Sequence, residues 1–196
     1  MMLDLPQPHD LRVERDETMS LCPASARRSV DEQPALPLCM DHACLAWEGA
    51  EVEDPRALAM AVDALDIEGT LVILANDVLA SERHLAAAVG MAHRRWERGR
   101  AVGRTLGAEL MRCLAGSHHI GEAIRTVGLQ PGSCKGWLVG LGVKQRDVEA
   151  LLPSLGFTPC APHTMTDEGR ARLGLPKTGD LERLALGLVA EADLLA

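Results

Sequence analysis

The sequence is poor in aromatic residues: its 196 residues include three Trp, one Phe and no Tyr. Aliphatic side chains must therefore supply nearly all of the buried area. So few aromatic residues exclude a row of stacking platforms for single-stranded nucleic acid. No uncharged apolar run approaches the roughly 18 residues that a membrane-spanning helix needs, so we expect no membrane partner. The first ten residues hold Asp4 but no Lys or Arg, and no secretory signal is visible.

Motifs for nucleotide binding and nucleophilic catalysis are also missing. No Gly-Lys-Ser/Thr triplet occurs, and Gly140-Leu141-Gly142 lacks the third glycine of a dinucleotide-binding loop. The Gly-x-Ser-x-Gly turn that exposes a nucleophilic serine is absent. We therefore predict no catalytic residue and no cofactor.

The six cysteines follow no regular spacing, which favours reduced thiols in a cytoplasmic protein over a disulfide scaffold; they stand at positions 22, 39, 44, 113, 134 and 160. Cys39, His42 and Cys44 lie close together in the sequence, and zinc sites use such ligands. No second cluster supplies a fourth ligand at a matching spacing. We therefore predict no metal site.

Charge is distributed unevenly along the chain. The net charge is −8, yet residues 82–125 hold eight arginines against four glutamates, which gives this segment +4 and leaves −12 on the rest. Because salt screens charges beyond roughly 8–10 Å, a local basic face on an acidic body can still bind a phosphate backbone. The alternative is that these residues only decorate solvated helix faces.

The first 40 residues differ from the remainder. They carry five prolines and mixed charges without a sustained apolar period, which predicts a poorly ordered extension over residues 1–40. Residues 41–196 are predicted to form a single domain.

Within that domain the apolar pattern predicts strands over 43–48, 70–75 and 134–141. Helices are expected after Asp54-Pro55, after Ser81, over 106–115 and over 120–127, with a short helix near 148–152, a turn of helix near 168–173 and a last helix from Asp180. Gly116 is expected to end one helix and Ser117 to cap the next. The predicted fold is an α/β domain of the α+β type, with a small mixed or antiparallel sheet packed by about seven helices.

The helix after Ser81 has two distinct faces. Its apolar stripe is Leu85, Ala88, Val89, Ala92 and Trp96, which predicts that Trp96 belongs to the core. Its other face carries Arg83, Arg94 and Arg98.

Two polar groups stand at predicted helix starts: Ser81, Glu82 and His84 at one, His118 and His119 at the other. Helix capping accounts for the serines, and surface exposure for the histidines. Three function classes remain open: a nucleic-acid-binding subunit, a protein-interaction adaptor without an RNA role, and a small enzyme that uses His118 or His119.

Three segments, taken in order, resemble the kinase-binding (CGI-121-like) subunit of the KEOPS complex. They are residues 78–85 (VLASERHL), 99–110 (GRAVGRTLGAEL) and 114–124 (LAGSHHIGEAI), followed by a similar closing helix. The resemblance covers about residues 43–195. This chain departs from the family pattern at His119, where Gln is usual, at Ala101, where Asn is frequent, and at Ala115, where Ser is usual.

The resemblance implies a non-catalytic regulatory subunit of the assembly that makes N6-threonylcarbamoyladenosine at position 37 of tRNA. Members of the family bind and stimulate a small RIO-like kinase/ATPase subunit, and through it they meet the catalytic threonylcarbamoyl-transferase subunit. Archaeal members also help to recruit tRNA through its 3′ CCA end. A cytoplasmic location is expected.

Charge, helix geometry and the family pattern together place the tRNA contacts on one set of residues. Arg94, Arg98, Arg100 and Arg104 are predicted to meet the RNA backbone. His84, His118, His119 and Arg125 are predicted to lie near a terminal-nucleotide pocket. These eight residues are the candidate site, and the arginines are expected to project outward together.

Overall fold

The computed structural model describes residues 40–194. These residues form four strands and seven α-helices in the order β1 (His42–Val52), α1 (Pro55–Asp63), β2 (Thr70–Ala75), α2 (Glu82–Glu97), α3 (Leu106–Ala115), α4 (Ile120–Val127), β3 (Ser133–Leu141), α5 (Gln145–Leu151), β4 (Phe157–Pro159), α6 (Asp167–Arg172) and α7 (Leu181–Leu194). A 3-10 helix over Leu152–Leu155 follows α5.

The four strands form one antiparallel sheet in the order β2-β3-β1-β4. The two long strands pair at its centre, with Leu45 opposite Leu138 and Trp47 opposite Gly136. β2 pairs only with β3, so it is an edge strand of the sheet. The predicted α+β fold is confirmed, and its sheet is antiparallel.

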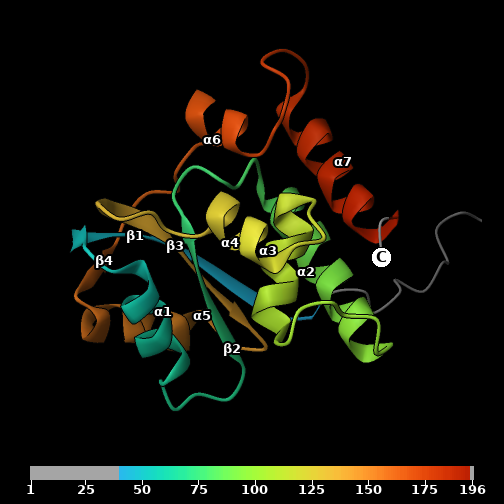
Figure 1. The fold of residues 1–196 in the computed structure, drawn as a ribbon. Coiled ribbons are helices and arrows are strands. Elements are labelled where there is room, and N and C mark those ends of the chain that lie inside the picture. The colour runs from blue at the N-terminus through green and yellow to red at the C-terminus, as the bar shows by residue number, and fades with distance from the viewer. Residues whose placement is uncertain (1–39, 195–196) are drawn as a thin grey trace, which may run out of the picture. The chain divides into compact units, whose positions relative to one another are not determined.

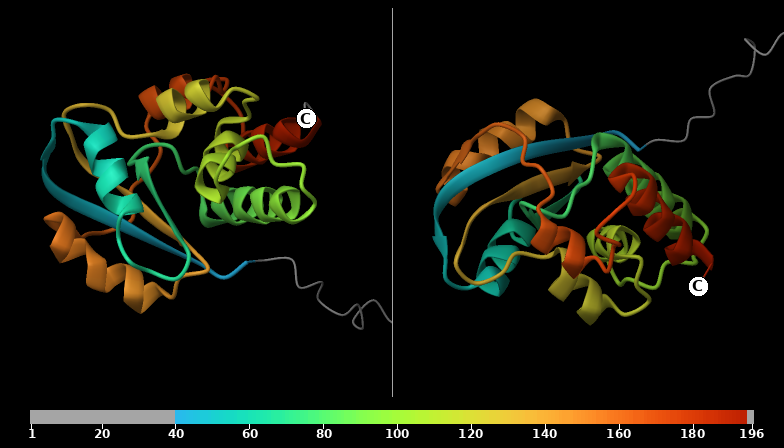
Figure 2. Two further views of the ribbon diagram at one scale, coloured as in Figure 1. Left: turned by 60° about the horizontal axis from the view of Figure 1, so that its bottom comes forward. Right: turned by 90° about the horizontal axis from the view of Figure 1, so that it is seen from above.

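Helices cover both faces of the sheet, as Figures 1 and 2 show. α1 and α5 lie on one face, and α2, α3 and α7 lie beyond the other, with α4 packed along α3. The arrangement follows from the two-residue alternation of the strands. In β2, Val72 and Leu74 enter the core under α2 and α3, whereas Leu71 and Ile73 enter the core under α1 and α5.

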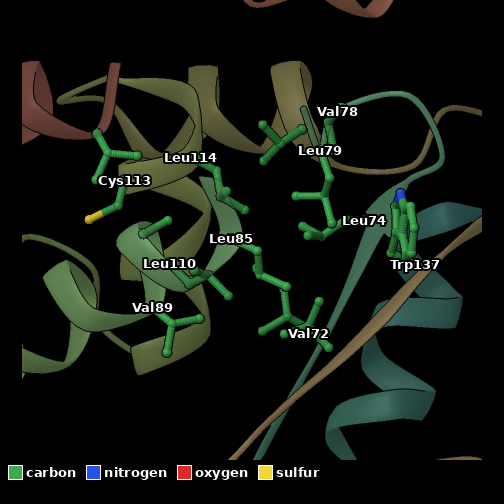
Figure 3. Packing of buried hydrophobic residues seen from close by; sticks show 14 of the residues in the cluster. Val72, Leu74, Val78, Leu79, Leu85, Val89, Leu110, Cys113, Leu114 and Trp137 are labelled. Atoms are coloured by element: carbon green, nitrogen blue, oxygen red, sulfur yellow. The ribbon is translucent and has the colours of Figure 1, made fainter. Parts of the chain in front are cut away.

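The larger core lies between the sheet and the pair α2 and α3 (Figure 3). Leu85 and Val89 from α2 and Leu110 and Leu114 from α3 point toward the sheet residues. Aliphatic side chains dominate this core, as the scarcity of aromatic residues predicts. Each such side chain contributes roughly 1.5–3 kcal/mol when it is fully buried.

Most predicted elements are confirmed. The strand over 70–75 is β2 to the residue, and Asp54 caps α1 through its carboxylate oxygen, which accepts from the N–H groups of Arg56 and Ala57. Ser81 caps α2 by accepting from the N–H of His84 at 3.1 Å. Gly116 ends α3 in the left-handed conformation, with φ of 61°.

Two predictions are wrong. Trp96 is 43% exposed, because the apolar stripe of α2 continues past the residues that the sheet can cover. The sequence pattern predicts no strand after residue 141, but Phe157–Pro159 form β4, which pairs with β1. The Phe157 ring stacks on Trp47 with centroids 3.8 Å apart, so one aromatic contact fixes this three-residue strand.

The extension predicted for residues 1–40 lies outside the described residues, except for Met40, and stays a prediction. Cys44, Cys113, Cys134 and Cys160, the cysteines that the structure describes, are free thiols. None of the helices within residues 40–194 has the length and apolar character needed to cross a membrane.

Candidate functional site

The segment between α2 and α3 carries most of the predicted RNA-binding arginines, and its backbone is held in place at both ends. At the end of α2, Gly99 adopts φ of 63°, and its N–H donates to the carbonyl of Trp96 at 3.1 Å. The N–H of Arg100 donates to the carbonyl of Arg95 at 2.8 Å. These two bonds form a Schellman motif, which turns the chain sharply at residue 99. Thr105 then caps α3 by accepting from the N–H of Ala108.

The carboxylate of Glu109 holds the middle of this segment, which we call the cationic loop (residues 98–105). Glu109 is fully buried, and its Oε2 accepts from the backbone N–H groups of Val102 at 3.0 Å and Gly103 at 2.8 Å. Its Oε1 accepts from Nε of Arg95 at 2.7 Å and from Nη2 of Arg112 at 2.8 Å. A single buried carboxylate therefore joins α2, α3 and the loop between them.

The two guanidinium groups extend the network to other parts of the fold. Arg95 donates to the carbonyl of Arg100 at 2.8 Å and to the carboxylate of Asp193 in α7 at 3.2 Å. Arg112 donates to the carbonyl of Ser117 at 3.0 Å and to that of Ala192 at 3.3 Å. The network thus also ties α7 and the turn after α3 to the cationic loop.

Burial alone would raise the pKa of Glu109. The hydrogen bonds from Arg112, the Gly103 N–H and Arg95 outweigh this effect and hold the pKa of Glu109 below its ordinary value. Burial would likewise lower the pKa of Arg112, but the hydrogen bond and the charge of Glu109 raise it. Both groups are therefore ionised at neutral pH.

The structure exposes three of the predicted RNA-contacting arginines on the cationic loop: Arg98, Arg100 and Arg104. No carboxylate within residues 40–194 lies in ion-pair range of these three side chains. Arg94 is half-buried on α2, where its Nη2 lies 3.7 Å from the sulfur of Met91. The backbone that carries Arg100 and Arg104 is anchored by Glu109, so their attachment points are fixed before a ligand binds.

The net charge of +4 over residues 82–125 overstates the exposed positive charge. Arg95 and Arg112 are buried and bound to Glu109, and Arg83 pairs with Glu182 of α7 at 3.4 Å. Two of the eight arginines therefore belong to the interior, and a third has a carboxylate beside it.

His118 and His119 lie in the turn between α3 and α4. His118 is half-buried and His119 is exposed. Ser117 was expected to cap α4 directly, but the cap position is His119, and the Ser117 hydroxyl accepts from the N–H of His119 at 3.1 Å while it donates to Glu122 at 2.7 Å. Arg125 is exposed on α4.

His84 is not at the surface. Its side chain is fully buried at the start of α2, where Nδ1 accepts from the N–H of Ala80 at 3.4 Å. Its Nε2 has no hydrogen-bond partner among the described residues. Burial lowers the pKa of His84 to about 4, so the ring is neutral at pH 7. We therefore leave His84 out of the candidate RNA-binding surface.

Sequence reasoning did not find the Glu109 network. One signal was present: Glu109 and Arg112 are three residues apart in a helix that is otherwise largely apolar, a spacing at which opposite charges pair. Arg95 follows Ala88 and Ala92 on the core side of α2, but its partner Glu109 is 14 residues away, and only the fold brings the two together. No group of three His, Cys, Asp or Glu side chains within residues 40–194 is placed to hold a metal ion.

The sequence pattern of the family described as "Kinase binding protein CGI-121" matches residues 51–155, more than half of the chain. The chain belongs to this family of kinase-binding proteins, and the resemblance found in the sequence is confirmed. The matched residues include α2, the cationic loop and Glu109. No curated protein matches the chain.

The buried carboxylate yields a first prediction. Glu109→Gln keeps the shape of the side chain but removes the buried carboxylate that faces Arg112, and it leaves Arg95 with only the half-exposed carboxylate of Asp193. We expect the free energy of unfolding to fall by about 3–5 kcal/mol in a denaturant titration. The control is Glu97→Gln, because Glu97 is exposed and its ion-pair partner within residues 40–194 is His93, at 3.4 Å. The effect of this control substitution should stay within about 0.5 kcal/mol. Equal effects of the two substitutions would contradict this role of Glu109.

The buried histidine yields a second prediction. The folded chain holds the pKa of His84 near 4, below the ordinary value of 6.5, so the unfolded chain binds the proton more tightly. The stability that His84 contributes is therefore complete above pH 6.5 and is lost as the pH falls toward 4, by roughly 3 kcal/mol in all. His84→Asn should flatten this part of the pH–stability curve. His119→Asn controls for the loss of a histidine as such, and an unchanged curve in His84→Asn would contradict the assignment.

Proposed function

We propose that this protein is a non-catalytic subunit of the KEOPS assembly, which makes threonylcarbamoyladenosine in tRNA. In this role it binds and stimulates the RIO-like kinase/ATPase subunit in the cytoplasm, reaches the threonylcarbamoyl-transferase subunit through that kinase, and helps to recruit tRNA through its 3′ CCA end. Membership in a family of kinase-binding proteins supports the kinase partner. The order of the three sequence segments supports the assignment to KEOPS.

The observation that carries the tRNA part is the cationic loop. Arg98, Arg100 and Arg104 are exposed on a backbone segment that a buried carboxylate holds in one conformation. Guanidinium groups on a fixed backbone bind phosphates with less loss of conformational entropy than groups on a mobile loop. We place the RNA backbone on these residues and Arg94, with His118, His119 and Arg125 toward the terminal nucleotide.

A second candidate is a kinase-binding adaptor that has no RNA role. The burial of Arg95 and Arg112 favours it, because these two arginines serve the fold and reduce the positive charge available to a polyanion. The two candidates differ in whether the isolated chain binds tRNA.

Charge reversal in the cationic loop separates them. The double variant Arg100→Glu/Arg104→Glu should bind tRNA at least about tenfold more weakly at moderate salt, and the slope of log affinity against log salt should fall by roughly 1.5, since each lost phosphate contact removes about 0.7–0.9. Filter binding or fluorescence anisotropy with tRNA, with and without its CCA end, provides the measurement.

The matched control is Arg56→Glu, because Arg56 is also exposed but lies on α1, on the other side of the sheet. It should change the affinity less than about threefold. Unchanged affinity and salt slope in the double variant would show that the cationic loop does not contact the RNA. No tRNA binding by the native chain, together with intact kinase binding, would favour the adaptor.

A further inference from the structure

Trp96 is an exposed aromatic side chain beside the cationic loop. It stands in the last turn of α2, and its backbone carbonyl accepts from the N–H of Gly99 at 3.1 Å, so the loop begins within one turn of it. The side chain is 43% exposed, whereas Trp47 and Trp137, the other two tryptophans of the chain, are buried. Because tryptophan is highly buried on average in folded proteins, this exposure sets Trp96 apart.

The indole ring of Trp96 has no partner within residues 40–194. Trp47 stacks on Phe157, and Trp137 donates its indole N–H to the carbonyl of Asn76 at 2.9 Å. Trp96 makes no ring contact of this kind in the same part of the chain, and its indole N–H donates to no acceptor there. The ring and its N–H are therefore available to a molecule that binds from outside.

The cationic loop that follows Trp96 combines apolar and positive groups. Val102 is 51% exposed between Arg100 and Arg104, on the backbone that the buried carboxylate holds. Glu97, the acidic residue next to Trp96, forms an ion pair with a histidine of its own helix. Figure 2 shows the end of α2 and the cationic loop on the side of the molecule opposite α1 and α5. One end of the fold thus presents an aromatic ring, an aliphatic side chain and unpaired arginines.

This combination matches an unpaired nucleotide. Each nucleotide carries a phosphate, which guanidinium groups bind, and a base, whose flat face stacks on an aromatic ring. In a duplex the bases stack on one another, so a side-chain ring meets the face of a base only where the strand is unpaired. A protein segment would need acidic and aromatic side chains in alternation to match both groups.

We infer that Trp96 stacks on an unpaired base of the RNA whose phosphates bind the cationic loop, so that this surface selects single-stranded RNA over duplex RNA. The inference rests on the proposed tRNA recruitment and names a residue that contacts a base. Stacking tolerates every base, so Trp96 selects for an unpaired strand and not for a particular sequence. With one ring in place of a row of rings, a single base is held at this point.

The test titrates the full-length chain with a short single-stranded RNA that ends in CCA and with a blunt duplex of the same strand. The native chain should bind the single strand at least about tenfold more tightly than the duplex. Trp96→Leu should weaken single-strand binding about tenfold and change duplex binding less than about twofold, because one stacked base is lost. The slope of log affinity against log salt should stay unchanged, since no phosphate contact is removed. Trp96→Phe keeps a stacking ring and should stay within about threefold of the native affinity.

Tryptophan fluorescence provides a second readout, because Trp96 is the exposed tryptophan of the three. Single-stranded RNA should quench the emission of the native chain, and Trp96→Phe should lose most of this quenching while it still binds. The matched control is Met60→Ala on α1, where Met60 is 65% exposed. It should change the affinity less than about twofold and leave the quenching intact. Thermal unfolding of each variant checks that the fold is intact.

Three results would overturn the inference. Unchanged single-strand affinity in Trp96→Leu would remove the ring from the RNA contact and leave the phosphate contacts of the cationic loop standing. Equal affinity of the native chain for single strand and duplex would show that the surface binds backbone charge alone. If Trp96→Leu weakened binding to the purified kinase and not to RNA, the ring would belong to the kinase interface. Failure of the native chain to bind either RNA would instead refute the tRNA part of the proposed function.

Discussion

The structure around the candidate site depends on one buried carboxylate. Glu109 accepts hydrogen bonds from two guanidinium groups and two backbone N–H groups. Without it, the buried Arg112 would lose the carboxylate that it contacts, and Arg95 would keep only the half-exposed Asp193. A buried ion pair is costly to assemble, but breaking it by removing one partner is more costly still. The network therefore fixes which elements must meet: the end of α2, the start of α3, the cationic loop and the end of α7.

This constraint connects the fold to the function that we propose. The carboxylate that joins the helices also fixes the position of the backbone at residues 102–103. It thereby sets the positions from which the side chains of Arg100 and Arg104 extend. The internal arginines hold the loop, and the exposed arginines are free to bind a ligand. Arginine therefore has two roles in one short segment, one inside the fold and one at the surface. For this reason the net charge of the segment overstates the positive charge that is exposed on its surface.

The sequence predicted the fold where one physical signal dominated. β2 was predicted to the residue because it is buried on both faces, which gives a continuous apolar run with clear ends. β4 was missed because it has only three residues and a single buried side chain, Phe157, whose partner Trp47 lies far away in the sequence. Trp96 was misplaced because helical periodicity does not reveal where the sheet beneath the helix ends.

The candidate site was harder to predict than the fold. Exposure of Arg98, Arg100 and Arg104 followed from their position after the end of α2, but the burial of His84 did not follow from its place near a cap. Contacts that depend on the closed fold leave little trace in local sequence.

The most direct test of the account is the exchange of the Val102 and Gly103 amide protons, measured by NMR on the native chain. If the Glu109 carboxylate holds the cationic loop, these two amides should exchange as slowly as those in the middle of α3, although they lie outside any helix or strand. Exchange as rapid as that of an open loop would show that the carboxylate does not fix this backbone, and the preorganised cationic surface would have no physical basis.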